Sequence, residues 1–537
     1  MYQKLIGILL FALILTAYQG CNSAEQTKNV FYWNIAGSFT GCDPAFANTQ
    51  ANTWVVNQIF DGLVALDDSL HLRPAIASRW EVSPNQTKYT FHLRNDVYFQ
   101  DDECFANGKG RRVVAKDVVY SYKRLLDKSL ASRGNWVFDG KVKTDEADNY
   151  AFYAPNDSTV ELDLIKPFSP FLQLLSLKYC SIIPHEAVES YKKNFRTHPV
   201  GTGPYQVFEF RENEKLILHP NKNYYQNNIT TKAAKLSAVS ISFINSKQNE
   251  FFSFISHRLS MMVGLDASFI NTILDKSGKL KPSVESKYQV HKNPFLNTEY
   301  IGINLDPNKW KNTPLSNKQF RQAINYAIDK EKLVRYMRNG IGQPANSGFI
   351  PPSLSSNTRY YPYNPQKAKL LLKEASSKVD IHEEIVLNTI DQYVDISVFL
   401  QQELKQYGIN VKIETVPGAA LSDLKTTGKA QLCRASWVAD YANPENYLSL
   451  FYSKNWTPKG DNYFHYKNPL FDKYYEQLIS GVNTELNLVT EMQNILTDDC
   501  PFIILFYDES VRLVHNNIRG LKTNPINMID LRGVYIE

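Results

Sequence analysis

One short segment combines residue types that could bind a small molecule with a positive and a negative charge. Residues 434–441 read Arg-Ala-Ser-Trp-Val-Ala-Asp-Tyr, with one cation, one large aromatic ring and one carboxylate between apolar neighbours. A sheltered carboxylate can hold an ammonium group, a guanidinium can hold a carboxylate, and an indole offers an apolar face. In a straight strand Arg434 and Asp440 lie about 20 Å apart, too far for a direct ion pair. The alternative is that Asp440 caps the following turn while Arg434 pairs elsewhere.

Motifs of covalent, metal or nucleotide chemistry are absent from the sequence. It contains no G-x-S-x-G, H-E-x-x-H, Walker A or G-x-G-x-x-G pattern. The ten histidines are scattered, and no two have the spacing of metal ligands on one helix face. Paired carboxylates such as Asp101-Asp102 and Asp498-Asp499 are typical of solvated turns and helix ends. We therefore predict no catalytic residue, no metal site and no cofactor, and a protein that is not an enzyme.

The composition is that of a large globular protein. The chain has 537 residues and a mass of 61.5 kDa, enough for about three or four domains of typical size. Hydrophobic residues make up 43%, and 59 basic against 54 acidic residues give a net charge of +5. This balance excludes wholesale disorder and gives no electrostatic reason to expect a nucleic-acid partner. Aromatic residues reach 13%, which suits either an aromatic-lined binding cleft or a large core.

The first 20 residues have the features of an export signal. Lys4 precedes an apolar run at residues 5–17, which as a helix would cover about 20 Å, short of the roughly 30 Å hydrocarbon core. Cys21 follows Gly20 as in the bacterial lipobox, whose cysteine is lipidated, although the two residues before Gly20 depart from that pattern. We predict cleavage after residue 20, a lipid anchor on Cys21 and a periplasmic location. A soluble secreted protein and an uncleaved anchor are the alternatives.

The remaining cysteines do not form a disulfide framework. Five are left after Cys21, at wide spacing, and no C-x-x-C pair is present. At most two bridges are possible in an oxidising compartment, and the sequence does not identify them. We expect most of these cysteines to be small buried hydrophobic residues: Cys42, Cys104, Cys180, Cys433 and Cys500.

Hydrophobic periodicity predicts an α/β fold. In the first half of the chain, alternation predicts strands near residues 30–35, 80–93, 160–164, 205–218 and 239–243, with a helix at 116–126. In the second half, apolar residues at helical spacing predict helices at residues 320–328, 365–375 and 396–407. The last helix stops at Gly408 and leads into strand alternation at residues 409–413, which is half of a βαβ unit. We expect three interleaved lobes rather than independent domains.

Eight short segments follow one another along the chain: residues 60–63, 80–83, 89–94, 115–124, 200–205, 320–329, 350–352 and 434–441. In this order and spacing the chain resembles the oligopeptide- and dipeptide-binding proteins of ABC importers, the large three-lobed class of extracellular solute-binding proteins. The resemblance runs from about residue 40 to the C-terminus. It implies an α/β, two-lobe periplasmic-binding-protein architecture with an extra third domain, mixed sheets and a hinged cleft.

The same resemblance implies how the chain is divided. A signal peptide at residues 1–20 would precede a discontinuous domain I, formed by residues 21–60, 182–296 and 506–537. Residues 61–181 would form the extra domain II, and residues 297–505 would form domain III, the second binding lobe.

Proteins of this family hold short peptides in a closing cleft and deliver them to an ABC permease. The resemblance therefore implies a monomeric binding subunit whose partners are short peptides, permease subunits in the inner membrane and the membrane itself, but not nucleic acid. Some relatives with the same fold bind nickel complexes, haem, sugars or murein peptides instead. A secreted hydrolase or adhesin is a remote alternative.

The resemblance also implies which side chains bind the two ends of a peptide. Asp440 matches the carboxylate that holds the α-ammonium in relatives, and Arg434 can pair with the carboxylate of a short peptide. With both ends held, these two residues would contact opposite ends of the ligand rather than each other. Tyr393 stands where some oligopeptide-binding relatives have a histidine that helps to hold the carboxylates of longer peptides.

Backbone contacts are implied at two further places. Ser436 and Val438, on either side of Trp437, would offer main-chain groups to a peptide that pairs with the protein as an added strand. A second backbone edge in the first lobe is expected at Asn48, Thr49 and Gln50. Such contacts would provide affinity that does not depend on the peptide's sequence.

Overall fold

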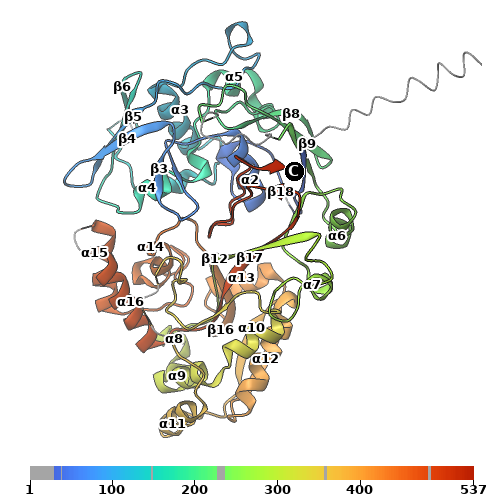
Figure 1. Cartoon of the computed structure of the whole chain (residues 1–537). Helices are drawn as coiled ribbons and strands as arrows, with labels where there is room; N and C mark the ends of the chain where they lie inside the picture. Colours follow the sequence, from blue (N-terminus) through green and yellow to red (C-terminus); the bar gives the residue numbers. More distant parts are fainter. Residues whose placement is uncertain are drawn as a thin grey trace, which may run out of the picture.

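The structure is a computed structural model that describes residues 29–537, apart from residues 38, 147–148, 227–235, 356–357, 359 and 482–484. The described residues within 29–226 and 516–537 form an upper body, and those within 304–501 form a lower body (Figure 1). The predicted signal peptide and Cys21 lie outside the described residues. No helix within the described part of the chain is long and apolar enough to span a bilayer.

One mixed sheet of 11 strands extends through both bodies. In spatial order its strands are β15 (Val411–Thr415), β14 (Ile385–Thr389), β16 (Leu432–Val438), β12 (Tyr288–Ile303), β17 (Phe502–His515), β11 (Met261–Val263), β1 (Val30–Asn34), β10 (Ala238–Ser242), β9 (Lys215–Pro220) and β8 (Tyr205–Arg211), with β13 (Gln343–Pro344) also beside β17. Strand β1 is parallel to β10, whereas β12 is antiparallel to both β16 and β17. The mixed sheet and its covering helices confirm the predicted fold class.

The two longest strands, β12 and β17, carry the chain between the bodies (Figure 1). Residues 288–294 of β12 pair with residues 509–515 of β17, and residues 298–302 pair with residues 502–507. The register shifts between Pro294 and Thr298, where the chain passes from one body to the other. Leu296 bonds to both bodies there, donating its N–H to Pro525 and accepting from the N–H of Ala439.

The upper body contains a second, antiparallel sheet. Its order is β4 (Ala77–Val82), β5 (Lys88–Leu93), β7 (Thr159–Asp163) and β6 (Phe152–Asn156). The β4–β5 hairpin has its turn at residues 83–86, inside the region near residues 80–93 where the sequence predicts strands. Helix α3 (Ala115–Leu126) confirms the helix predicted at residues 116–126 and buries an apolar face, with Val118, Tyr122 and Leu125 in the core. Two small two-stranded antiparallel sheets, β2 (Val64–Leu66) with β3 (Leu72–Pro74) and β18 (Ile518–Arg519) with β19 (Tyr535–Ile536), complete the strands of the described residues.

The lower body confirms the predicted α/β pattern. Helix α12 (Val394–Lys405) connects the parallel strands β14 and β15, and Gly408 follows it at a φ of 75° that favours glycine. Asn364 caps the next helix upstream by accepting the N–H of Lys367. Within the described residues, the other α-helices of this body are α8 (Pro307–Trp310), α9 (Lys318–Ala327), α10 (Lys330–Met337), α11 (Pro365–Ala375), α13 (Gly418–Thr426), α14 (Glu445–Leu448), α15 (Pro469–Ser480) and α16 (Glu485–Asp499).

The largest hydrophobic core contains buried side chains from the N-terminal part of the described chain, such as Phe31 and Ile241. It also includes residues near the C-terminus, such as Leu531. It contains core residues from both predicted domains I and II, so these two parts share one hydrophobic core. The lower body has its own cores, formed around Phe349 and around Ile324. The proposed boundaries between three domains remain a prediction.

The five cysteines in the described part of the chain are all free. Four are fully enclosed, namely Cys42, Cys180, Cys433 and Cys500, whereas Cys104 is partly exposed. This confirms that most of them serve as small buried hydrophobic residues. Within the described ranges, no cluster of three or more His, Cys, Asp and Glu side chains could hold a metal ion.

A turn with glycine at residues 201 and 203 contacts the C-terminal end of one helix of the upper body. Helix α2 (Gln50–Ile59) ends against residues 201–203, and Gly203 donates its N–H to the Ile59 carbonyl at 2.8 Å. A Cβ on Gly203 would lie 2.4 Å from the Ile59 carbonyl carbon, and one on Gly201 would lie 2.1 Å from its oxygen. Only glycine therefore allows this close backbone approach.

We expect Gly203→Ala to lower the free energy of unfolding by about 1–3 kcal/mol, because the added methyl group forces the backbone of α2 to shift. Gly418→Ala is the matched control, since a Cβ at that position has no atom within 4 Å. Thermal unfolding of both variants, followed by circular dichroism, measures the difference. Equal midpoints for the two variants would contradict the steric explanation.

Candidate functional site

A cavity of about 280 Å³ lies between the two bodies. Its lining includes five of the sequence-predicted binding residues, namely Asn48, Thr49, Gln50, Val438 and Asp440. Trp136 and Tyr179 line it from the upper body, and Phe295 and Leu296 line it where β12 crosses. The other three predicted residues, Arg434, Ser436 and Trp437, stand behind this lining on β16.

Asp440 follows the end of β16 and is oriented by Asn446 of α14. Its N–H donates to Asn446 Oδ1 at 3.0 Å, and the Asn446 amide approaches the Asp440 carboxylate at 3.4 Å. Trp437 supports the same amide, because its indole Nε1–H donates to Asn446 Oδ1 at 2.9 Å. The role of Trp437 in this structure is therefore to position Asn446, and through it Asp440.

The carboxylate of Asp440 is accessible from the cavity, and no cation of the described residues pairs with it. Among the described residues it forms no ion pair, and only the amide of Asn446 bonds to it. The surrounding protein desolvates the group and raises its pKa above the ordinary value, the Asn446 contact opposes this shift, and the charge of Asp461 adds to it. An unpaired carboxylate of this kind can receive a ligand's ammonium group.

Arg434 is already neutralised by another residue of the protein. Its guanidinium Nη2 donates to both oxygens of Glu299, at 2.9 and 2.8 Å, and its carbon lies 3.6 Å from the centre of the Tyr393 ring. The β12–β16 register explains the pair, because Glu299 stands opposite Ser436, on the same face as Arg434. This arrangement matches the alternative considered from the sequence, in which Arg434 pairs with a residue elsewhere in the chain.

Burial makes the Arg434–Glu299 pair a structural feature of the lower body. The side chain of Glu299 is 4% exposed and that of Arg434 is 15% exposed. Desolvation raises the pKa of Glu299, and the guanidinium of Arg434 opposes that shift. Only Nη2 of the guanidinium is bonded to Glu299, so a ligand carboxylate that reached Arg434 would share this cation with Glu299.

Strand β16 has an open edge next to the cavity. Strand β12 pairs with residues 432–438 along one side, whereas β14 reaches only Leu432 and Cys433 on the other side. No strand in the described part of the chain pairs with residues 434–438 on that second side. Backbone groups near Ser436 and Val438 can therefore accept an added strand.

The opposite wall is formed by the start of α2. Thr49 caps this helix by accepting the N–H of Asn52 at 3.2 Å, which leaves Asn48 and Gln50 on either side of the cap facing the cavity. These residues and Asp440 approach the same space from different bodies. A ligand there would contact both bodies at once.

Lys178 is a lining residue that the sequence did not indicate. It begins the short helix η4 (Lys178–Cys180), next to Tyr179, and desolvation lowers the pKa of its ammonium group to about 8. No ion pair or hydrogen bond of this ammonium group occurs with the described residues. Nothing in the local sequence distinguishes this lysine from surface lysines, so only the fold reveals it.

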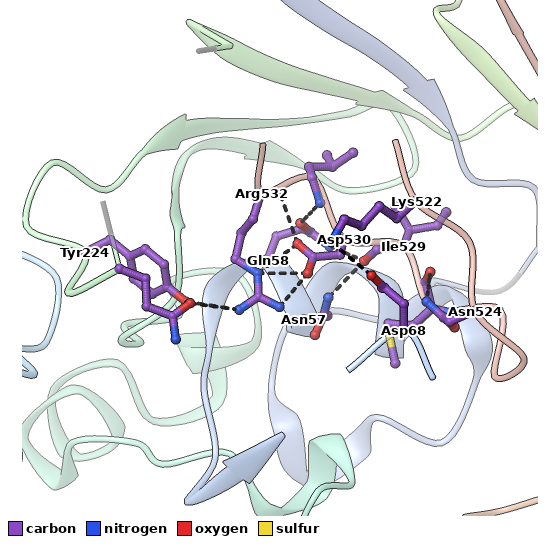
Figure 2. A network of polar contacts seen from close by, with 12 residues as sticks. Asn57, Gln58, Asp68, Tyr224, Lys522, Asn524, Ile529, Asp530 and Arg532 are labelled. Carbon is purple, nitrogen blue, oxygen red and sulfur yellow. Dashed lines mark hydrogen bonds and ion pairs between the residues drawn. The ribbon is translucent and has the colours of Figure 1, made fainter. Parts of the chain in front are cut away.

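The acidic groups that act on the Lys178 ammonium group are Asp61 and Asp530, and Asp530 belongs to the network in Figure 2. Arg532 binds Asp530 through Nε at 2.9 and 2.8 Å and also donates to the Tyr224 hydroxyl at 3.2 Å. A second hollow of about 570 Å³ borders this network, and its other charges are paired as well: Asp67 with Arg73, and Asp68 with Lys522. Among the described residues that line this hollow, each of these charges is therefore paired.

Two bodies joined by crossing strands, with a cavity between them, define the architecture of a periplasmic binding protein. The chain belongs to the bacterial extracellular solute-binding proteins, family 5, because the model of the middle region of that family matches residues 71–459. This match covers more than half of the chain.

Similar proteins extend the comparison to almost the whole length. The chain is 27% identical over 537 residues to the glutathione-binding protein GsiB of Shigella dysenteriae serotype 1, covering 97% of this chain and 96% of GsiB. It is 26% identical over 566 residues to the periplasmic oligopeptide-binding protein OppA of Salmonella typhimurium strain LT2, covering 98% of each chain. Among solved structures, the unliganded open form of the murein tripeptide-binding protein MppA superposes with a TM-score of 0.80 at 24% identity, over 95% of this chain and 97% of MppA.

Proposed function

We propose that the protein captures short peptides outside the cytoplasm and delivers them to an ABC permease. The observation that carries this proposal is the unpaired carboxylate of Asp440 at the end of the open edge of β16. The similarity to OppA and GsiB, which are named for oligopeptides and glutathione, supports it.

The geometry of the cavity supports the following proposal for how a peptide is held. Its α-ammonium binds Asp440, and its backbone adds to the free edge of β16 near Ser436 and Val438. Asn48, Thr49 and Gln50 contact it from the upper body, so that the bound ligand favours closure of the two bodies. Recognition of main-chain groups leaves the sequence of the peptide largely free.

Blocking the amino group of a peptide tests this function directly. We expect Ala-Ala-Ala to bind in isothermal titration calorimetry and N-acetyl-Ala-Ala-Ala to bind at least roughly tenfold more weakly, because acetylation removes the charge that Asp440 receives. Recovery of intact peptide by mass spectrometry supports the proposal that the protein is a binder and not an enzyme. Equal affinities for both peptides would show that Asp440 does not hold the ammonium group.

We also propose that the protein is a monomer anchored to the membrane through Cys21, after removal of residues 1–20. The mass of the mature protein tests this proposal, since a diacylated N-terminus adds the mass of its lipid chains. Cys21→Ser should yield a protein that is released without detergent. Recovery of wild-type protein with an unmodified N-terminus would contradict the lipid anchor.

A further inference from the structure

Three aromatic side chains, which we call the aromatic wall, line the cavity near Asp440. Trp136 of η3 (Asn135–Val137) and Tyr179 of η4 belong to the upper body. Tyr441 directly follows Asp440 in the lower body, and its ring stacks with that of Trp136, with centres 6.3 Å apart and planes at 29°. Desolvation raises the pKa of Tyr179 to about 12 and the charge of Asp440 adds to this shift, so this phenol lies near the same carboxylate.

The two upper rings are held by contacts within the upper body. The ring of Tyr179 packs against the backbone of Gly134, where a Cβ would lie 2.5 Å from ring carbon Cδ1. The Trp136 carbonyl accepts from Lys141 Nζ at 2.7 Å, and the same ammonium group lies 5.7 Å from the centre of the Trp136 ring. These contacts position both rings before a ligand arrives.

Tyr441 is held within the lower body by a buried carboxylate. Its hydroxyl donates to Glu445, which also accepts from the hydroxyl of Tyr475. Desolvation raises the pKa of Glu445, while these two hydrogen bonds and the charge of Lys141 oppose the shift. Because Glu445 binds the hydroxyl of Tyr441, the ring rather than the hydroxyl is available to a ligand.

The aromatic wall is assembled from both bodies. Trp136 and Tyr441 meet across the boundary, and Ser169 of the upper body donates its N–H to the Ile479 carbonyl of α15 at 3.1 Å. A side chain that packs against Trp136 and Tyr441 would therefore contact both bodies and favour the arrangement in which they touch.

The rest of the cavity suits an uncharged group beside Asp440. Apolar side chains contribute to the lining from both ends of the chain and from β12, among them Leu66, Leu296 and Met528. Lys178 is the other charged residue of the described lining, and its ammonium group interacts with the two acidic groups named above. The volume of 280 Å³ is slightly below the roughly 300–1,000 Å³ of complete small-molecule sites, so the cavity holds one end of a peptide.

We propose that the cavity takes the first side chain of a peptide together with its ammonium group, and that this side chain is aromatic or large and apolar. The inference rests on the proposed function and specifies its substrate class: peptides that begin with a residue such as Phe, Tyr or Leu. The side chain packs against the aromatic wall while the ammonium group binds Asp440. An acidic first side chain would stand without a counter-charge in an apolar space, beside another carboxylate.

Calorimetry with two peptides of equal composition tests the assignment. Phe-Ala-Ala and Ala-Ala-Phe carry the same groups, but only the first places its ring next to the α-ammonium group. We expect the wild-type protein to bind Phe-Ala-Ala roughly 10- to 100-fold more tightly than Ala-Ala-Phe, the effect of burying one large apolar side chain. Asp-Ala-Ala should bind more weakly than Ala-Ala-Ala.

Substitutions show whether the aromatic wall causes this preference. In Trp136→Ala the ratio of the two affinities should fall at least roughly fivefold, because one aromatic contact is lost. Trp136→Phe should retain most of the ratio. Tyr153→Ala is the matched control, since Tyr153 is an exposed aromatic residue of the upper body that does not line the cavity. If Trp136→Ala does not fold, Tyr179→Leu takes its place, with the same expected loss.

The outcomes separate this inference from the proposed function. Equal affinities of the wild-type protein for Phe-Ala-Ala and Ala-Ala-Phe, with Ala-Ala-Ala bound, overturn the inference and leave the proposed function intact. A preference that persists unchanged in the folded wall variant overturns it as well, and so does an equal loss for Phe-Ala-Ala and Ala-Ala-Ala, which would assign the rings to the ammonium group. Failure of all four peptides to bind overturns the proposed function itself.

Discussion

Replacing Asp440 by Asn is expected to weaken the binding of Ala-Ala-Ala by about 2–5 kcal/mol, or roughly 30- to 5,000-fold in Kd. The substitution keeps the shape of the side chain but removes the charge that faces the ligand's ammonium group. Because Asn446 and Trp437 hold the position from behind, the local structure should remain intact. Calorimetry with the purified variant gives the change in Kd.

A nearby carboxylate provides the matched control. Asp461 lies close enough to influence the pKa of Asp440, but it does not line the cavity. Asp461→Asn should therefore change peptide affinity far less than Asp440→Asn. If the two variants lost equal affinity, a general electrostatic effect would replace the direct contact as the explanation.

The pH dependence of binding provides a second readout for the same residue. Burial raises the pKa of Asp440, so the carboxylate takes up a proton at a higher pH than an ordinary Asp. The protonated form carries no charge, and peptide affinity should therefore fall as the pH is lowered through this raised pKa. The fall should be absent in Asp440→Asn, which has no group to titrate at this position.

Replacing Glu299 by Gln should be the most destabilising change at the site, lowering the free energy of unfolding by about 3–5 kcal/mol. It leaves the guanidinium of Arg434 enclosed without a counter-charge, and Arg cannot release its proton. Urea denaturation followed by tryptophan fluorescence measures the loss.

The reciprocal variant should be milder. In Arg434→Met the remaining Glu299 can become neutral, because burial already raises its pKa. The double variant Glu299→Gln/Arg434→Met should lose less stability than the sum of the single variants, since it leaves no unpaired charge. Strictly additive losses would mean that the two side chains do not stabilise each other.

Local sequence patterns predicted the helices and strands whose contacts are between residues close together in the sequence. The alternation around β4 and β5, the helical face of α3 and the order of α12, Gly408 and β15 depend on contacts within a few tens of residues. The resemblance to a family added the positions of Asp440 and the α2 start, which the structure brings to one cavity. Their roles in peptide binding remain predictions.

Long-range pairing explains what the sequence could not show. Arg434 meets Glu299, 135 positions earlier, only because β12 and β16 are neighbours in the sheet. Lys178 lines the same cavity as Asp440 only because the fold places η4 there. Neither residue has a local motif, so a single sequence gives no reason to prefer it over other arginines and lysines.

The sheet that runs through both bodies also limits how this protein can be dissected. Strands β12 and β17 pair with each other in both bodies. A fragment containing one body alone would therefore retain only part of each strand. The severed halves would present unpaired backbone edges, which are templates for aggregation. Mapping of binding regions should therefore rely on point substitutions or inserted labels, because expressed halves of the molecule would lose their solubility together with the site.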